Sequence, residues 1–435
     1  MTRHRYLEAR LPLAEDPLLL MTRLARSRLF HPYVVYENQC HWSFAGGALA
    51  TVRLTGRQAR QLKRVGELLD RAPVADWRAY GWAAFELGAV LAGTAPAGPE
   101  PLLHLIVPRT EARTDGREIL LRSTDRAGLD ELIGLVDAHG AAAPPEPSAR
   151  LDLPVEDTGN YRAAVAAALT ELHGQGPLKK VILSRRLPVP APVDLFATYV
   201  AGRRANTPAR SFLLDLGGIR AAGFSPETVA EVTPDGRVTT RPLAGTRART
   251  GTGPDDARLR AELLADPKEI HEHAISVRLA LDDLSTVCDK TQVDDFMTVL
   301  PRGTVQHLAS TATGRLRPGH GPWDAFAALF PAVTATGIPK ASAYPLIRAL
   351  EGHPRGLYAG AVLTHDADGT LDAALVLRTV FQQDGRCWLQ AGAGIVDQSR
   401  PEREHEETCE KLRSVAHHLV PHNPAADSTM DQPAR

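Results

Sequence analysis

Cysteine, excess charge and long apolar runs are all scarce in this sequence of 435 residues. The four cysteines lie far apart and form no Cys-x-x-Cys pair; they are Cys40, Cys288, Cys387 and Cys409. This distribution is typical of free thiols in a reducing compartment. The formal net charge is −1, so the chain offers neither a basic field for nucleic acid nor an acidic tail.

No uninterrupted apolar run approaches the ~20 residues of a membrane-spanning helix. Near the N-terminus, Glu15 and Asp16 interrupt the apolar run that begins at Leu11, so we find no signal peptide. We therefore expect a soluble, cytoplasmic protein with no membrane partner and no nucleic-acid partner.

The length fits either several domains or one large unit. A Pro- and Ala-rich stretch at 140–148 is the best candidate for a linker, although a surface loop within one compact domain fits it equally well. We take residues 1–150 as an N-terminal part of the fold and residues 151–421 as the catalytic part. The polar residues 422–435 show no pattern, and we expect them to be disordered.

The predicted strands far outnumber those of a simple alternation of strands and helices. We therefore expect a large α+β fold, with antiparallel sheets in the middle and helices on the outside. One of the helices should run from Lys268 to Leu284, with a buried stripe made of Ile270, Ala274, Val277 and Leu281.

The last third of the chain carries the densest set of polar groups. A Gly-Ala-Gly turn at 392–394 leads into a helix near Ser399, with Pro401 in the first turn, where its missing N–H costs nothing. Glu404 and Glu407 share one face of this helix, and Lys411 extends that face.

Two carboxylates on one helical turn usually form a solvated face. Here a second pair, Glu269 and Glu272, occurs at the same spacing in another predicted helix. Mg²⁺ takes few protein carboxylates and completes its shell with water and substrate oxygens. The two pairs together therefore suit a magnesium site.

Further motifs follow one another along the chain in a set order. They are Lys180-Val-Ile-Leu-Ser-Arg, Phe224-Ser-Pro-Glu227, Pro242-Leu-Ala-Gly-Thr246-Arg, Lys268-Glu-Ile-His-Glu272-His, Val305-Gln-His307-Leu, Gly337-Ile-Pro-Lys, Arg355-Gly-Leu-Tyr358, Leu375-Val-Leu-Arg378 and Gly392-Ala-Gly-Ile-Val. With Glu404, Glu407 and Lys411, this series resembles the chorismate-utilising enzymes, which include anthranilate, aminodeoxychorismate, isochorismate and salicylate synthases. The resemblance covers roughly residues 160–419 and implies the fold of that family.

Within the family, the chain looks most like the single-chain salicylate synthases of siderophore pathways. Lys180 stands where the amine-using members are expected to carry glutamine, and Thr334 stands where isochorismate synthases that stop at the intermediate tend to have alanine. The sequences of segments 296–299 and 305–310 are also similar to that subgroup, and no fused glutamine amidotransferase is visible. Two departures, Tyr344-Pro345 and Ala359, put the local loop geometry in question.

The resemblance implies a Mg²⁺-dependent conversion of chorismate through isochorismate to salicylate and pyruvate. Lys180 would be the base that activates water and Glu227 the acid that protonates the leaving 4-hydroxyl. Burial should lower the pKa of Lys180 and raise that of Glu227. Mg²⁺ would bridge Glu272 and Glu407 to the ring carboxylate, with Glu269 and Glu404 acting directly or through water.

The remaining site residues would hold the substrate. Arg378 and Tyr358 would grip the pyruvyl carboxylate, and Lys411 would balance the glutamates and contact the ring carboxylate. The other expected contacts are the backbone of Gly392 and Gly394, Gly245 and Thr246 along the ring, and Thr334 and His307 around the pyruvyl group. From the residues alone, plainer interpretations stay open: His307 as a core histidine, Arg378 as part of an ion pair, Lys180 as a strand-edge charge and Glu227 as a turn carboxylate.

Three other functions are weighed against this one. An isochorismate synthase would release the intermediate, and an anthranilate or aminodeoxychorismate synthase component would need ammonia or a glutaminase partner. A catalytically inactive homologue would serve as a binding subunit. We expect a monomer that uses chorismate and Mg²⁺ and has no glutamine amidotransferase subunit.

Overall fold

The computed structural model describes residues 4–138, 151, 153, 160–249, 251–303 and 305–422. The predicted linker at 140–148 and residues 423–435 of the predicted disordered tail lie outside the described residues, whereas His422 is described and its backbone N–H bonds the Pro192 carbonyl. In the part of the chain that is described, no helix is both long enough and apolar enough to cross a membrane.

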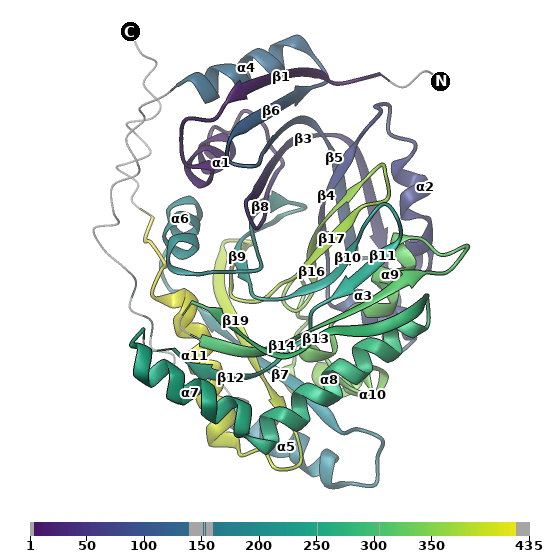
Figure 1. Cartoon of the computed structure of the whole chain (residues 1–435), viewed down its shortest axis with the longest axis vertical. Helices are drawn as coiled ribbons and strands as arrows, with labels where there is room; N and C mark the ends of the chain where they lie inside the picture. The colour runs from purple at the N-terminus through teal and green to yellow at the C-terminus, as the bar shows by residue number, and fades with distance from the viewer. Residues whose placement is uncertain are drawn as a thin grey trace.

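A large antiparallel sheet forms the framework of the molecule (Figure 1). Its first half contains β1 (Leu7–Pro12), β2 (Tyr33–Asn38), β3 (His41–Thr55), β4 (Arg78–Ala83), β5 (Pro101–Thr114), β6 (Glu118–Ser123), β7 (Lys180–Pro188), β8 (Arg210–Leu216) and β9 (Ile219–Ser225). Its second half contains β10 (Thr228–Val232), β11 (Arg237–Thr240), β12 (Leu243–Ala248), β13 (Cys288–Arg302), β14 (Val305–Leu316), β15 (Gly337–Ile338), β16 (Ala361–Asp366), β17 (Leu371–Leu375), β18 (Thr379–Gln383) and β19 (Arg386–Ile395).

Helices cover the outside of this framework. They are α1 (Pro17–Arg26), α2 (Val65–Leu69), α3 (Glu86–Leu91), α4 (Arg126–Asp137), α5 (Tyr161–His173), α6 (Leu195–Ala205), α7 (Gly253–Ala265), α8 (Pro267–Ser285), α9 (Pro322–Leu329), α10 (Lys340–Glu351) and α11 (Pro401–Ala416), with short 3₁₀ helices η1 (Gly56–Arg64) and η2 (Val333–Ala335). The predicted α+β fold, with antiparallel strands inside and helices outside, is confirmed.

The two halves of the chain share the sheet. Strand β2 pairs with β8, with Tyr36 opposite Phe212, and strand β4 pairs with β16, with Trp82 opposite Val362. The apolar side chains of these strands belong to continuous buried clusters that cross the predicted division near residue 150. Folding of the N-terminal strands therefore supports the sheet that carries the later motifs.

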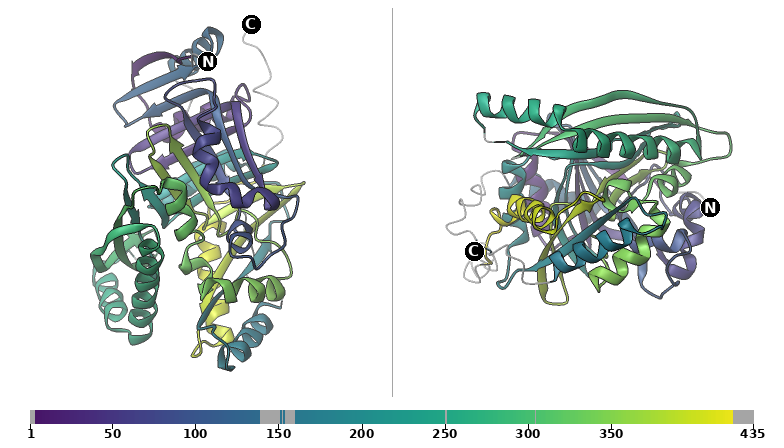
Figure 2. Two further views of the ribbon diagram at one scale, coloured as in Figure 1. Left: turned by 90° about the vertical axis from the view of Figure 1, so that its right-hand side faces the viewer. Right: turned by 90° about the horizontal axis from the view of Figure 1, so that it is seen from below.

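Two bodies stand side by side at one end of the molecule (Figure 2). One consists of β12, β13 and β14 with helices α7 and α8, and the other contains α5, α10 and α11 around β7 and β19. Helix α8 begins at a well-defined cap, because the Asp266 side chain accepts hydrogen bonds from the backbone N–H groups of Lys268 and Glu269, and Pro267 occupies the first turn.

The predicted buried stripe of α8 is wrong in part. Of its four members only Val277 is fully buried, and the buried face consists of His273, Ser276, Val277, Ala280 and Leu284. The stripe is displaced because α8 packs on β12 and β14 through polar contacts, in which the His273 ring bonds Ala244 and Ser310. A pattern based on apolar residues alone misses such a helix face.

The two departures from the family's sequence pattern, Tyr344-Pro345 and Ala359, are accommodated without a break in the surrounding elements. Helix α10 continues through Pro345, and the preceding Tyr344 is buried with its ring 5.7 Å from that of Phe85, edge to face. Ala359 is fully buried with a φ of +58°, a conformation that costs an alanine some strain.

Candidate active site

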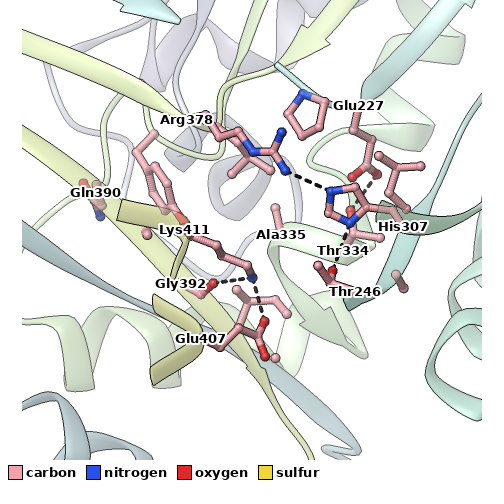
Figure 3. A pocket seen from close by; sticks show the side chains of 18 of the residues that line it. Glu227, Thr246, His307, Thr334, Ala335, Arg378, Gln390, Gly392, Glu407 and Lys411 are labelled. Atoms are coloured by element: carbon pink, nitrogen blue, oxygen red, sulfur yellow. Dashed lines mark hydrogen bonds and ion pairs between the residues drawn. The ribbon is translucent and has the colours of Figure 1, made fainter. Parts of the chain in front are cut away.

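A cavity with about 950 Å³ of empty space, open mouth included, lies between the two bodies. All predicted site residues line it except Glu269 and Glu404. The predicted residues that line it come from many elements of the fold. These elements are strands β7, β12, β14 and β19, helices α8 and α11, the 3₁₀ helix η2, and the connections that hold Glu227, Tyr358 and Arg378. Lys180 and Lys411, which are 231 positions apart in the sequence, therefore line the same cavity. Figure 3 shows Lys411 with other residues of its lining.

Lys180 is the first residue of β7 and is buried, with 3 % of its surface exposed. Its Nζ atom lies 2.6 Å from Oε1 of Glu272, on α8. Burial raises the pKa of Glu272, but the charge and hydrogen bond of Lys180 outweigh it and hold the pKa below its usual value. Gly394 makes room for this ion pair, because a Cβ atom there would lie 3.0 Å from Lys180 Cε and 3.2 Å from Glu272 Oε1.

Glu227 occupies the tight connection between β9 and β10 and is buried. Burial raises its pKa to about 8, against the opposing effects of a hydrogen bond from Thr334, a backbone N–H of Leu243 and the charge of Lys180. The Thr334 hydroxyl donates to Oε1 of Glu227 at 2.7 Å. The carboxyl group therefore holds a proton at neutral pH, and the predicted upward shift of its pKa is confirmed.

A chain of three side chains crosses the cavity from Arg378 to Thr246 (Figure 3). Arg378 donates to Nε2 of His307 at 2.9 Å, and Nδ1 of His307 lies 2.9 Å from the Thr246 hydroxyl, its direct neighbour across the β12–β14 pair. A guanidinium can only donate, so Nε2 accepts and Nδ1 carries the ring hydrogen. The hydrogen of the Thr246 hydroxyl is thereby left to point into the cavity.

The electrostatics of this chain favour an anion. Burial, followed by the charge of Arg378, holds the pKa of His307 well below its usual value, so the ring is neutral. Burial and the neighbouring Arg302 lower the pKa of Arg378 to about 10, which still leaves it charged at neutral pH. His307 is therefore a neutral ring that lines the cavity and is hydrogen-bonded to both Arg378 and Thr246.

The opposite wall is formed by α11 and β19. Lys411 Nζ lies 2.7 Å from Glu407 Oε1 and donates to the backbone carbonyl of Gly392 at 2.8 Å. The predicted balancing of the glutamates by Lys411 is thus present as an ion pair. Tyr358 contributes a buried phenol to the same wall, and burial raises its pKa.

The four predicted metal ligands each have a cationic neighbour. The nitrogen–oxygen distances are 2.6 Å for Lys180 and Glu272, 2.7 Å for Lys411 and Glu407, 3.1 Å for Arg247 and Glu269, and 3.8 Å for Lys268 and Glu404. Among the described residues, no three His, Cys, Asp or Glu side chains stand together as a ready metal site. Each carboxylate is instead paired with one of these lysines or with the arginine.

The chemistry of the four carboxylates nevertheless fits a hard divalent cation. Both carboxylate oxygens of Glu404 are buried and have no hydrogen-bond partner among the described residues. Burial, and then the charges of Glu407 and Glu272 respectively, raise the pKa values of Glu404 and Glu269. Buried oxygens that are short of donors and repel one another are what a cation such as Mg²⁺ would neutralise.

Gln390 and His273 are among the residues of the site that the sequence does not predict. Gln390 lines the cavity and donates to the Ser184 hydroxyl at 2.8 Å; its only signal was a polar residue inside the strand-like run before the Gly-Ala-Gly turn. His273 lies directly behind the wall that Ala244 and Gly245 form. Its signal was its place at helical spacing from Val277, Ala280 and Leu284.

A family model described as chorismate binding enzyme matches residues 27–417. The chain belongs to this family. It is 43 % identical over 432 residues to the salicylate synthase of Mycolicibacterium paratuberculosis, covering 94 % of this chain and 95 % of that protein. The anthranilate synthase component 1 of Methanothermobacter thermautotrophicus is 40 % identical over 243 residues, which are 55 % of this chain and 52 % of that one.

The chain shares the fold of the chorismate binding enzymes over most of its length. The structure of the menaquinone-specific isochorismate synthase of Escherichia coli superposes with a TM-score of 0.75 at 23 % identity, covering 96 % of this chain and 95 % of that one. The resemblance drawn from the ordered motifs is therefore confirmed at the level of family and fold.

Proposed function

We propose that this protein is a salicylate synthase that converts chorismate, through isochorismate, to salicylate and pyruvate. One observation carries the proposal: Lys180 and a protonated Glu227 line the same cavity, beside cations that can hold a dicarboxylate. The near full-length similarity to a salicylate synthase supports it, whereas the anthranilate synthase relative matches only about half of the chain.

The first half-reaction needs an acid and a base. Water must add at C2 of the ring while the 4-hydroxyl leaves, so one group takes a proton and another gives one. Glu227 gives its proton to the departing hydroxyl, since its carboxyl group is protonated at neutral pH. Lys180, which donates to Glu272 in this structure, acts as the neutral amine: its ammonium form leaves Glu272 and gives a proton to solvent, and the amine then takes a proton from the attacking water.

The cations and hydroxyls of the cavity hold the substrate. Arg378 grips the pyruvyl carboxylate through the guanidinium N–H groups that His307 and the Arg302 carbonyl do not take up, and Tyr358 adds a phenolic donor. The Thr246 hydroxyl, fixed by His307, donates its free hydrogen to the same end of the ligand. Lys411 contacts the ring carboxylate from the other wall.

Mg²⁺ is the proposed cofactor, held by Glu272 and Glu407, with Glu269 and Glu404 acting directly or through water. When bound there, a magnesium ion would neutralise the charge of the ring carboxylate and withdraw electrons from the ring. The protein's own part is to supply buried carboxylate oxygens, and the two oxygens of Glu404, which have no hydrogen-bond partner among the described residues, support this role.

The second half-reaction expels pyruvate and makes the ring aromatic. A hydrogen passes from C2 to the methylene carbon of the enolpyruvyl group while the C3–O ether bond breaks, so no external base is consumed. A folded substrate conformation is the main requirement. Thr334, held against Glu227, and the apolar side chains Leu389, Leu412 and Val415 form the wall that would enforce it.

Product analysis tests the proposal. Purified protein is incubated with chorismate and Mg²⁺, with and without ammonium, and the products are separated by chromatography. Salicylate as the product in both arms supports it. Isochorismate as the final product would favour an isochorismate synthase. An aminated product that appears only with ammonium would favour an anthranilate-type enzyme, and absence of turnover would favour a binding subunit.

A further inference from the structure

Strand β12 is interrupted where it passes the cavity. Leu243 lies opposite Ala309 of β14 and Thr246 lies opposite His307, so Ala244 and Gly245 together face the single residue Leu308. This β-bulge takes the carbonyl oxygen of Ala244 out of the regular ladder. The segment that presents Gly245 and Thr246 to the substrate therefore depends on a partner other than β14.

That partner is His273 of α8. Its ring is fully buried, Nδ1 lies 3.2 Å from the Ala244 carbonyl oxygen, and Nε2 lies 2.7 Å from the Ser310 hydroxyl. A carbonyl can only accept, so Nδ1 carries the hydrogen and Nε2 accepts from Ser310. Ser310 is itself bonded by the backbone N–H of Met297 at 3.0 Å, which anchors the far side of the ring.

The bulge also packs closely against α8 at Gly245. Gly245 has a φ of +85°, and a Cβ atom there would lie 3.1 Å from Oε2 of Glu269 and 3.2 Å from Leu308 Cδ1. The hydrogen bond from His273 and the close approach of Glu269 thus fix the same two residues of β12. Glu272, the partner of Lys180, is the neighbour of His273 on the same helix.

We propose that His273 is a positioning residue, whose Nδ1–H holds the Ala244–Gly245 peptide so that Gly245 and Thr246 stay in register with the glutamates of α8. The inference rests on the proposed function, in which those two residues contact chorismate. His273 does not touch the substrate, and its effect should appear as weaker substrate binding. The bond to Ser310 should matter for stability alone.

Two amide substitutions separate the two bonds of the ring. In His273→Asn the amide nitrogen stands near the place of Nδ1 and can still donate to Ala244, whereas in His273→Gln it reaches toward Ser310. We expect KM for chorismate to rise about tenfold in His273→Gln, with kcat changed much less, and to stay within about threefold of wild type in His273→Asn. Ser310→Ala is the matched control and should lower the melting temperature without changing KM.

Equal losses in the two amide variants, or an unchanged KM in His273→Gln, would overturn the proposal. Turnover by the wild-type protein is measured first; its absence refutes the proposed function, and calorimetric binding of chorismate to the same variants then decides on His273. A measurement that needs no variant is the nitrogen NMR spectrum of histidine-labelled wild-type protein. It should show His273 as the Nδ1–H tautomer, and an Nε2–H tautomer would overturn the inference.

Discussion

Lys180 Nζ and Glu272 Oε1, which lie 2.6 Å apart, join strand β7 to helix α8 across the cavity. The predicted base and one of the predicted metal ligands are thus each other's partner in this structure. A ligand that engages Oε1 of Glu272 competes with Lys180 for that oxygen, and this couples the occupancy of the carboxylate cluster to the availability of the amine. The predictions below test separate members of this arrangement.

Glu227→Gln should remove the acid while keeping the shape of the side chain. We expect kcat for salicylate formation to fall about 10³-fold, with KM changed little, because the amide has no proton to give to the leaving hydroxyl. Salicylate fluorescence gives the rates. Glu118→Gln, at an exposed position of β6, is the control and should behave as wild type. A Glu227→Gln enzyme with more than a tenth of wild-type kcat would contradict the assignment.

The pKa of Glu227 also sets the alkaline side of the pH profile. The acid must be protonated to act, and its pKa in the folded protein is raised to about 8, so kcat/KM should fall tenfold per pH unit above about pH 8. The profile is measured over pH 6–10 with salicylate formation as the readout. A flat profile up to pH 10 would show that protonated Glu227 is not required.

The raised pKa of Glu227 should also make stability depend on pH. A salt-bridged carboxylate stabilises the fold as pH rises, whereas Glu227 should destabilise it. The folded state retains the Glu227 proton between pH 4.5 and about 8, where the unfolded chain has lost it, so the free energy of unfolding falls as pH rises through this range. Glu227→Gln lacks this titration, so its free energy of unfolding relative to that of wild type should rise by a few kcal/mol between pH 5 and pH 8. Each unit by which the folded pKa lies above the unfolded pKa contributes roughly 1.4 kcal/mol, and urea unfolding at the two pH values measures the difference. An unchanged difference would mean that Glu227 titrates normally.

Thr334→Ala should change the products. The variant loses the hydroxyl that bonds Glu227 and opens space beside the reacting ring. We expect the ratio of isochorismate to salicylate in the product mixture to rise about tenfold, the effect of losing one buried hydrogen bond. Thr334→Ser keeps the hydroxyl and should restore most of the wild-type ratio. A Thr334→Ala enzyme that makes only salicylate would show that Thr334 does not decide between release of isochorismate and its conversion to salicylate.

Metal binding can be measured without substrate. Glu404 has two buried carboxylate oxygens with no hydrogen-bond partner among the described residues, so Glu404→Gln should weaken Mg²⁺ binding in calorimetry by at least tenfold. Glu402→Gln is the matched control, because Glu402 is exposed in the same first turn of α11. Equal Mg²⁺ affinity in the two variants would remove Glu404 from the proposed site, and full activity in a chelator would contradict a metal requirement.

The ordered motifs predict the family and most of the site, because each keeps its residue types at a fixed place on a strand, turn or helix. They do not predict contacts between distant segments. Thr334 and Glu227 are 107 positions apart, and Lys180 and Glu272 are 92 apart, so only the folded sheet brings them together. Sequence spacing suggested that four glutamates form one cluster, but the structure pairs each with a different cation.

Helix α8 shows the other limit of sequence analysis. A buried histidine counts as polar in any hydrophobic pattern, so such a pattern misses His273 and shares only Val277 with the buried face of the helix. Only the Ala244 carbonyl, which accepts from Nδ1, and the Ser310 hydroxyl, which donates to Nε2, explain why an imidazole is stable there.

The most direct test of the account is the stoichiometry of products formed from chorismate and Mg²⁺ by the purified protein. Salicylate and pyruvate should accumulate in equal amounts, each matching the chorismate consumed, with isochorismate appearing only as a transient. Chorismate that is consumed without salicylate, with isochorismate as the lasting product, would contradict the central claim that both half-reactions take place in this cavity.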